Sequence, residues 1–236
     1  MRLVHLTGKA SRPLHPKHLI KKNKLWYKSY LNVDDILLDI GCGSAVDSIR
    51  AAKLVKKVTG LDIDSTSLNS ARKIVAAEKI KNIRFMLHNA NKKLPFPNNN
   101  FDKVVCSDVL EHLEKRTYAL NEIRRVLKKN GLLFLVTDNP NTSWKKLLRS
   151  HGLFSYADYD HRYEYPKEEI ISILKSKKFI ILSIGEVSYD TPFKGFIDLT
   201  GGISISIYKK LARWKRKKLK QNPQDTAGYK IVAQKI

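Results

Sequence analysis

Cysteine is scarce in this sequence, and long apolar runs are missing from it. The two cysteines, Cys42 and Cys106, lie in glycine-rich or apolar segments where a disulfide framework has no purpose, so both thiols are expected to be reduced. No stretch approaches the roughly 18 to 20 consecutive apolar residues of a membrane span, and the N-terminus lacks the apolar core of a signal peptide. We therefore expect a cytoplasmic protein.

Acidic residues are also scarce, and two segments have none. The chain carries 45 Lys and Arg against 22 Asp and Glu, a net charge of +23. Residues 1–33 and 209–220 hold eight basic residues each and no acidic residue. Basic residues gathered in this way favour an anionic partner surface, although a lysine-rich proteome would also raise the total.

Short apolar runs alternate with segments of helical spacing along most of the chain. This alternation predicts an α/β fold with a doubly wound, mostly parallel sheet. The predicted strands are 36–40, 58–63, 83–87, 101–106, 131–137, 179–187 and 228–234. The predicted helices are 46–56, 65–79, 117–129 and 167–177.

A chain of 236 residues with 42% apolar content predicts one core domain with appendages. We expect the domain to consist of residues 34–188 and 227–236. Residues 1–33 would form a basic N-terminal cap. Residues 189–226, which separate the last two predicted strands, are too many for a hairpin and would form a basic amphipathic insertion.

The first predicted strand runs into a turn of small residues, Asp39-Ile40-Gly41-Cys42-Gly43-Ser44-Ala45. Glycines between a strand and a helix let the backbone approach a ligand closely, although they also serve simple tight turns. The next strand ends at Asp62, about twenty residues on, where a carboxylate can accept hydrogen bonds from both hydroxyls of a ribose. The two features together indicate a nucleotide-type site.

Four further segments indicate which kind of nucleotide-type cofactor this site would bind. They are Asn89-Ala90, Leu94-Pro95-Phe96-Pro97 before Phe101-Asp102, Ser107 to Leu113, and Glu122 to Gly131. In this order and spacing they resemble the Rossmann-like methyltransferases that use S-adenosylmethionine, especially the subgroup related to ubiquinone and menaquinone biosynthesis. The resemblance covers about residues 34–138. It implies a seven-stranded sheet with an antiparallel C-terminal strand and a helical insertion before that strand.

The resemblance also implies a role for each matching residue. Asp39, Gly41 and Gly43 would hold the methionine end of S-adenosylmethionine, and Asp62 would hold its ribose. Asn89 and Ala90 would contact the adenine, and Ser107 would line the cofactor. Two positions depart from the common pattern: Ala45 stands where a third glycine is frequent, and Asn89 stands where an aspartate usually accepts from the adenine amino group.

Two histidines are candidates for removing a proton from a hydroxyl acceptor. His161, in Asp160-His161-Arg162-Tyr163, lies where relatives often carry a histidine that faces the acceptor; a surface or capping role is the alternative. His112 follows Glu111 after the fourth strand, at the rim of the expected site. Glu111 itself is expected to support the start of a helix. The alternative is that Glu111 or His112 acts as a base or a metal ligand, but no residue is assigned to a metal site.

The least generic segment is the basic one near the C-terminus. Ile203, Ile207, Leu211 and Trp214 fall at steps of four, four and three, so they share one helical face beside Lys and Arg. Residues 203–220 therefore resemble an interfacial helix on an anionic membrane, or alternatively a cap that packs on the core. We expect methyl transfer to a small-molecule, glycan or lipid-linked acceptor, with a hydroxyl as the methylated group, by a protein that binds peripherally to the inner membrane face.

Two other functions remain open from the residues. The basic edges could bind RNA phosphates, which would make the protein an RNA methyltransferase. RNA is the less favoured partner, because Ser107-Asp108-Val109-Leu110 stands where enzymes acting on flipped bases carry an Asn/Asp-Pro-Pro-aromatic motif. The second alternative is a cofactor-binding regulator without catalytic activity.

Overall fold

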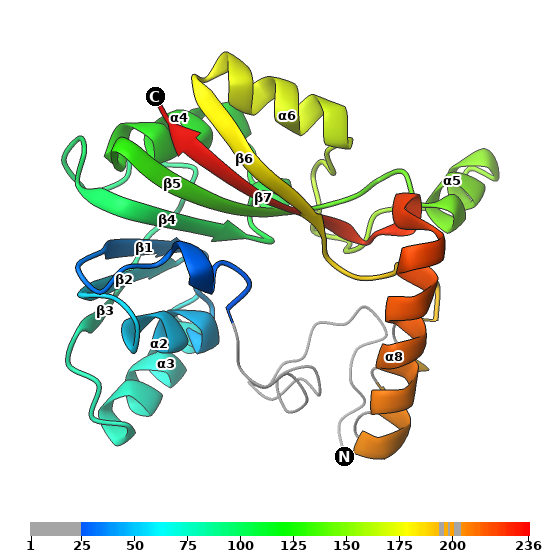
Figure 1. Ribbon diagram of the computed structural model, residues 1–236, viewed down its shortest axis with the longest axis horizontal. Coiled ribbons are helices and arrows are strands. Elements are labelled where there is room, and N and C mark those ends of the chain that lie inside the picture. Colours follow the sequence, from blue (N-terminus) through cyan, green and yellow to red (C-terminus); the bar gives the residue numbers. More distant parts are fainter. Residues whose placement is uncertain (1–24, 194–195, 198, 201–203) are drawn as a thin grey trace.

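A seven-stranded mixed sheet organises the chain, as the sequence predicts (Figure 1). The computed structural model describes residues 25–193, 196–197, 199–200 and 204–236. The strand order is β3-β2-β1-β4-β5-β7-β6, and β7 is antiparallel to both of its neighbours. The strands are β1 (Ile36–Ile40), β2 (Lys57–Asp62), β3 (Ile83–Leu87), β4 (Phe101–Ser107), β5 (Leu127–Asp138), β6 (Phe179–Glu186) and β7 (Gly228–Lys235).

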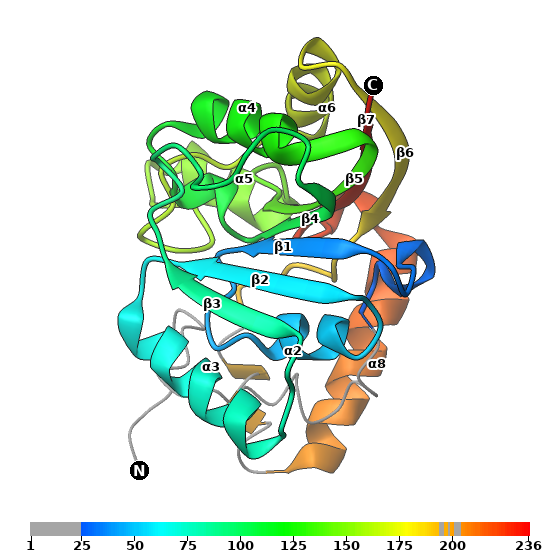
Figure 2. The ribbon, with the colours of Figure 1, turned by 90° about the vertical axis from the view of Figure 1, so that its left-hand side faces the viewer.

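Helices cover both faces of the sheet, which is why its strands are apolar on both sides (Figures 1 and 2). Leu38 of β1 and Leu133 of β5 pack in a cluster with residues of α4 and α6, whereas their neighbours Leu37 and Phe134 pack on the opposite face with α2. The helices are α2 (Val46–Ala52), α3 (Ser65–Ala77), α4 (Arg116–Val126), α5 (Ser143–Ser150), α6 (Lys167–Ser176) and α8 (Ile205–Gln221), with short 3-10 turns η1 (Lys28–Tyr30), η2 (Leu110–His112) and η3 (Pro223–Asp225).

The predicted helix 117–129 is wrong at its C-terminal end. Helix α4 ends at Val126, and Leu127 already pairs with Phe101 of β4. The register then shifts, with Asn130 in a left-handed conformation at φ 62°, before Leu132 pairs with Lys103. Strand pairing thus overrides the helical spacing of these residues. Helix α5 was not predicted from the sequence.

The described part of the predicted N-terminal cap packs on the sheet. The ring of Tyr27 stacks on Phe134 at a centroid distance of 4.6 Å, and Leu25 is buried in the same cluster. Residues 1–24 of that segment lie outside the described residues. The boundary at residue 33 therefore stays a prediction.

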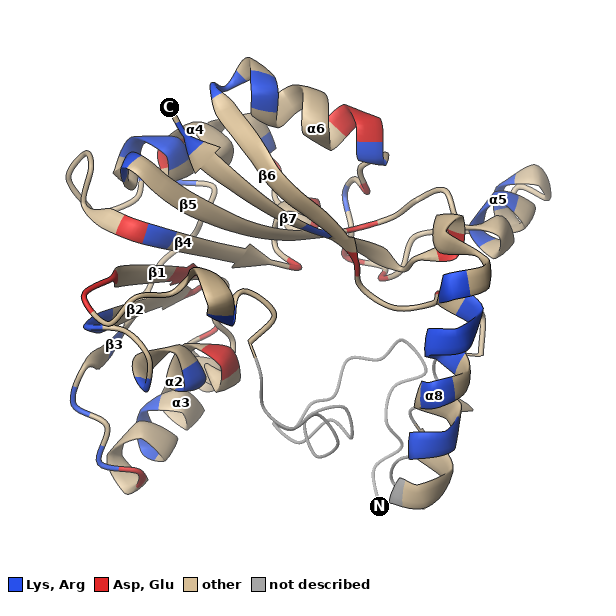
Figure 3. Ribbon diagram, viewed as in Figure 1, with Lys and Arg blue, Asp and Glu red and all other residues tan. Residues whose placement is uncertain are grey.

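The predicted insertion begins and ends at a paired neck. Tyr189 forms a β-bridge with Thr226, and the backbone N–H of Asp190 donates to the carbonyl oxygen of Asp225 at 2.7 Å. Helix α8 follows within this segment and carries basic residues along its length (Figure 3). In the described ranges, no helix is both long and apolar enough to cross a membrane.

Candidate active site

The turn between β1 and α2 has the backbone conformation that its small residues predict. Gly41 and Gly43 have φ of 70° and 51°, in the left-handed region that favours glycine. The N–H groups of Gly41 and Cys42 both donate to the carbonyl oxygen of Leu61, at 2.7 and 2.9 Å, which fixes the turn to the end of β2. Ala45, the N-cap of α2, is also left-handed at φ 60°. This conformation explains why a glycine suits that position.

The two glycines have different surroundings, which predicts different effects of substitution. A Cβ on Gly41 would lie 2.2 Å from Cγ2 of Val109, whereas a Cβ on Gly43 would meet nothing within 4 Å. We expect Gly41→Ala to lower the free energy of unfolding by about 2–4 kcal/mol, through backbone strain and overpacking. Gly43→Ala should cost only the backbone part, about 1–2 kcal/mol. Denaturant unfolding of both variants measures this, and equal losses would contradict the placement of Val109.

Asp39 lies buried under this turn at the end of β1, with 6% of its surface exposed. Ser48 Oγ donates a hydrogen bond to its carboxylate, but burial outweighs this bond and raises the pKa of Asp39 to about 7. An ammonium group placed against Asp39 would restore the ionised form. A buried carboxylate in this state fits the cationic methionine end of S-adenosylmethionine.

Asp62 ties the glycine turn to β2. One carboxylate oxygen accepts from the N–H of Gly43 at 2.7 Å, and the other accepts from the N–H of Asp64 at 2.8 Å. Each oxygen keeps a second lone pair, so Asp62 can still accept from a ribose hydroxyl. Asp64 has a separate task, because its carboxylate accepts from the N–H groups of Thr66 and Ser67 as the N-cap of α3.

The remaining predicted cofactor residues lie at the same edge of the sheet. Asn89 and Ala90 follow β3, and Ser107 ends β4. The side-chain oxygen of Asn89 accepts from the N–H of Asn91 at 2.9 Å, so it already shapes its own turn. Parallel strands β1 to β4 thus bring every predicted cofactor residue to their carboxyl ends, where open α/β sheets bind ligands. The cradle in front of Gly43 and the buried Asp39 fit that cofactor.

The two candidate histidines lie against each other at this edge. His112, in η2, and His161, in the loop between α5 and α6, have ring centroids 4.6 Å apart and nearly perpendicular planes. The loop is held to η2 because the N–H of Arg162 donates to the carbonyl oxygen of Glu111 at 2.8 Å. The two histidines predicted as candidate bases come from distant segments of the chain, and the fold brings them together.

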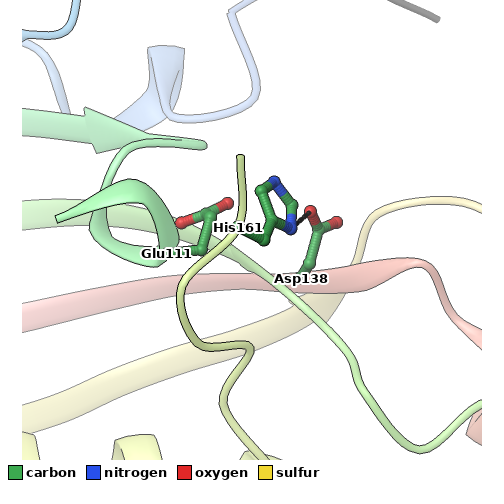
Figure 4. A group of neighbouring side chains, drawn as sticks. All are labelled: Glu111, Asp138 and His161. Atoms are coloured by element: carbon green, nitrogen blue, oxygen red, sulfur yellow. Dashed lines mark ion pairs between the residues drawn. The ribbon is translucent and has the colours of Figure 1, made fainter. Parts of the chain in front are cut away.

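Carboxyl groups surround His161 (Figure 4). Asp138 Oδ2 lies 3.6 Å from Nδ1 of His161, and burial followed by the charge of Asp108 raises the pKa of Asp138 to about 6. Glu111 is fully buried; this burial, with the charges of Asp138 and Asp108, holds the pKa of its carboxyl well above the ordinary value. Within the part of the chain that the structure describes, neither carboxyl oxygen of Glu111 has a hydrogen-bond partner.

Glu111, Asp138 and His161 lie close enough for candidate ligand atoms from all three to fall within 4.8 Å of one another. We assign no metal ligand here. Asp138 was missed at the sequence level, although it ends β5 just as Asp62 ends β2. An acidic residue at the end of a predicted strand was the sequence signal that could have identified Asp138.

Comparison with known proteins identifies the core of the chain. Residues 38–135 match the family described as "Methyltransferase domain". This segment is a Rossmann-like methyltransferase domain. The class to which it belongs uses S-adenosylmethionine as the methyl donor. The predicted resemblance and cofactor are confirmed.

Curated relatives agree with this assignment over part of their length. A demethylmenaquinone methyltransferase from Listeria monocytogenes is 33% identical over 148 residues, which is 56% of this chain and 62% of the relative. A mitochondrial ubiquinone biosynthesis O-methyltransferase from Schizosaccharomyces pombe is 30% identical over 160 residues, 65% of this chain and 58% of the relative. The chain thus spans about three fifths of the length of these relatives.

Solved structures share the fold at lower sequence identity. An S-adenosylmethionine-dependent methyltransferase from Methanosarcina mazei is 22% identical with a TM-score of 0.63, covering 91% of this chain and 99% of the other. The [4+2]-cyclase SpnF is also 22% identical, with a TM-score of 0.65, covering 87% of this chain and 76% of the other. Because a cyclase has the same fold, the fold alone does not determine the reaction.

Proposed function

We propose that this protein transfers the methyl group of S-adenosylmethionine to a hydroxyl of a small-molecule, glycan or lipid-linked acceptor. The observation that carries the proposal is the meeting of two residue sets at one edge of the sheet. The residues that match the cofactor motifs lie at the ends of β1 to β4, and His112 and His161 lie beside each other after β4 and β5. A methyl donor and a proton acceptor would be neighbours there.

The chemistry of the methyl donor determines which tasks are left to the residues of the chain. S-adenosylmethionine, when bound, supplies a methyl group that its sulfonium already activates. The residues of the chain then have two tasks: Asp39 and Asp62 bind and orient the donor, and His161 or His112 accepts the proton of the hydroxyl. No step requires the chain to form a covalent bond to substrate.

Cofactor binding is the first test. We expect calorimetry to show that the protein binds S-adenosylmethionine and its demethylated product with micromolar dissociation constants. Asp62→Ala should weaken this binding by about 1–3 kcal/mol, because charge-assisted hydrogen bonds are lost. Asp62 also holds Gly43, so the matched control is Asp64→Ala, which removes the neighbouring carboxylate and costs helix capping only. Equal affinity losses in the two variants would move the ribose contact away from Asp62, and absence of heat with both ligands would contradict the proposal.

Helix α8 supports a membrane surface as the place where a lipid-linked acceptor is met. Its 17 residues include eight Lys and Arg and no acid. On its apolar stripe Ile207 is 49% exposed and Trp214 is 40% exposed, although Trp214 also contacts Tyr189 edge to face. Ile207 is therefore not buried against the core of the protein. Its exposure favours an interfacial membrane helix over a cap that packs on the core. Ile203 of the predicted stripe lies outside the described residues.

Vesicle binding tests this part of the proposal. We expect the protein to sediment with vesicles of equal parts phosphatidylcholine and phosphatidylglycerol at low salt, with about 1 kcal/mol from each basic residue near the surface, and to be released as salt rises. RNA binding would respond to salt in the same way. Ile207→Ser with Trp214→Ser removes apolar area but no charge, so it should weaken vesicle binding and leave RNA binding unchanged. Unchanged vesicle binding would identify α8 as an electrostatic or RNA-binding surface.

A further inference from the structure

A buried ion pair lies directly behind His161. Nζ of Lys145, on α5, is 2.6 Å from Oε2 of Glu164, and their side chains are 1% and 0% exposed. Nζ also donates to the carbonyl oxygen of Asn139 at 2.9 Å. The other oxygen of Glu164, Oε1, accepts from the N–H of Ala157 at 2.5 Å and lies 2.9 Å from Nδ1 of His161. The hydrogen bonds of Lys145 and Glu164 are thus all formed in buried or half-buried surroundings.

Stability alone does not explain this pair. Removing two charges from water is costly, and apolar side chains of similar volume often stabilise a protein as well as a buried ion pair does. A pair of this kind is therefore a candidate for a specific task. Its geometry indicates the task, because Lys145 and Ala157 each donate to one oxygen of the carboxylate, and the second lone pair of Oε1 is presented to His161.

The contact with Glu164 bears on which nitrogen of His161 carries the proton. Burial would raise the pKa of Glu164, but the hydrogen bond with His161 and the charge of Lys145 outweigh burial and lower it below the ordinary value. Lys145 Nζ, 2.6 Å away, pairs with the ionised carboxylate, and an ionised carboxylate only accepts hydrogen bonds, so we assign Nδ1 of His161 as the donor. Asp138 Oδ2 lies farther from that nitrogen, at 3.6 Å against 2.9 Å for Glu164. Nε2 is then left with its lone pair.

The second ring nitrogen of His161 faces away from Glu111 and Asp138. In Figure 4 the ring nitrogen that is not joined to Asp138 by the dashed line points away from both Glu111 and Asp138. Of the two ring nitrogens, it is therefore the one left for a proton donor other than these two carboxyl groups. The arrangement matches a carboxylate–histidine pair, in which one ring nitrogen is anchored and the other exchanges the proton.

We propose that Glu164, itself held by Lys145, is the positioning residue that keeps His161 protonated at Nδ1 and stabilises the imidazolium formed when Nε2 takes a proton. The inference rests on the proposed function for the source of that proton. The acceptor oxygen forms its bond to the methyl carbon and loses its proton to Nε2, and the sulfur keeps the electron pair of the broken carbon–sulfur bond. Glu164 stays ionised throughout and balances the new charge on the ring.

The experiment records long-range ¹H–¹⁵N correlation spectra of the full chain labelled with ¹⁵N-histidine, at a pH well above the ordinary histidine range and without cofactor or acceptor. His161→Gln assigns the signals. We expect the Nδ1-protonated tautomer of His161 to exceed the other by about tenfold or more, the factor given by a hydrogen bond to a charged group. Glu164→Gln should bring the ratio close to one or reverse it, and Glu164→Asp should retain part of the preference.

Two further variants keep the test decisive. Glu164→Gln leaves Lys145 buried without its partner, so the double variant Lys145→Met with Glu164→Gln provides a fold without either charge and should show the same loss of preference. Glu169→Gln removes a carboxylate that accepts from Tyr163 instead, and should leave the His161 signals unchanged. A wild-type His161 protonated at Nε2, or a ratio unaffected by loss of Glu164, overturns the proposal. Because no cofactor is present, failure of methyl transfer and failure of this inference are distinguishable.

Discussion

Replacing Asp39 by asparagine is expected to stabilise the free protein and to weaken its binding of S-adenosylmethionine. The carboxyl of Asp39 is buried, and its pKa rises from 3.8 to about 7, chiefly because of burial. Between these two values the native state holds a proton that the unfolded state has lost, so stability falls as the pH rises from about 4 to 7. The full cost, on the order of 4 kcal/mol as an upper bound, is present above pH 7.

The amide introduced by Asp39→Asn carries no charge and can still accept from Ser48 Oγ, so this pH-dependent loss should disappear from the unfolding free energy. Cofactor affinity should fall by about 10- to 100-fold, since a hydrogen bond between charged groups contributes about 1.5–3 kcal/mol. Thermal unfolding at pH 5 and pH 8, with calorimetry at pH 8, measures both effects. Asp47→Asn, an exposed neighbour paired with Arg50, is the matched control. Unchanged affinity in Asp39→Asn would place the methionine contact elsewhere.

The meeting of the proposed cofactor residues at one edge of the sheet was predictable because the signals for it are local in sequence. Asp39 and Gly41 follow one apolar run, and Asp62 ends the next; parallel strands must then bring these ends to one edge. The glycine turn also confirms its sequence signal, with left-handed backbone at Gly41 and Gly43. What the spacing could not show is that the carboxylate of Asp62 accepts a hydrogen bond from the N–H of Gly43.

The groups around His161 escaped prediction because nothing in their local sequence marks them as buried. Lys145 stands in Ser143-Trp144-Lys145-Lys146, where a lysine pair suggests a solvated face, yet its side chain is 1% exposed. Its partner Glu164 is nineteen residues away in a loop without periodicity. Hydropathy treats each charge singly, whereas a buried pair exists only through its tertiary contact.

Periodicity failed where tertiary pairing decides the structure. Leu127 and Lys128 continue the helical spacing of α4, but pairing with β4 makes them strand. In α8, by contrast, the spacing correctly predicts a helix with one apolar face. The spacing cannot tell whether that face is buried against the protein. The exposed fraction of Ile207 provides that information, and it comes only from the structure.

Replacing His161 by alanine is expected to lower turnover by about 10²- to 10⁴-fold, the contribution typical of a positioned acid–base group. Cofactor binding should be unchanged, because His161 lies in the loop between α5 and α6 whereas the proposed cofactor residues lie at the ends of β1 to β4. The assay supplies methyl-labelled S-adenosylmethionine to a lysate and measures label in the lipid, glycan, RNA and protein fractions. The fraction that gains label with the wild type identifies the class of acceptor.

Two histidine variants make the result specific. His151→Ala removes an exposed ring that contacts the carbonyl oxygen of Leu147, so it should leave turnover unchanged. His112→Ala removes the ring packed against His161 and should reduce turnover less than loss of the base itself. Near-normal turnover in His161→Ala together with a large loss in His112→Ala would assign the proton to His112. Glu164 would then orient a histidine that takes no proton, and the tautomer preference of His161 would be purely structural.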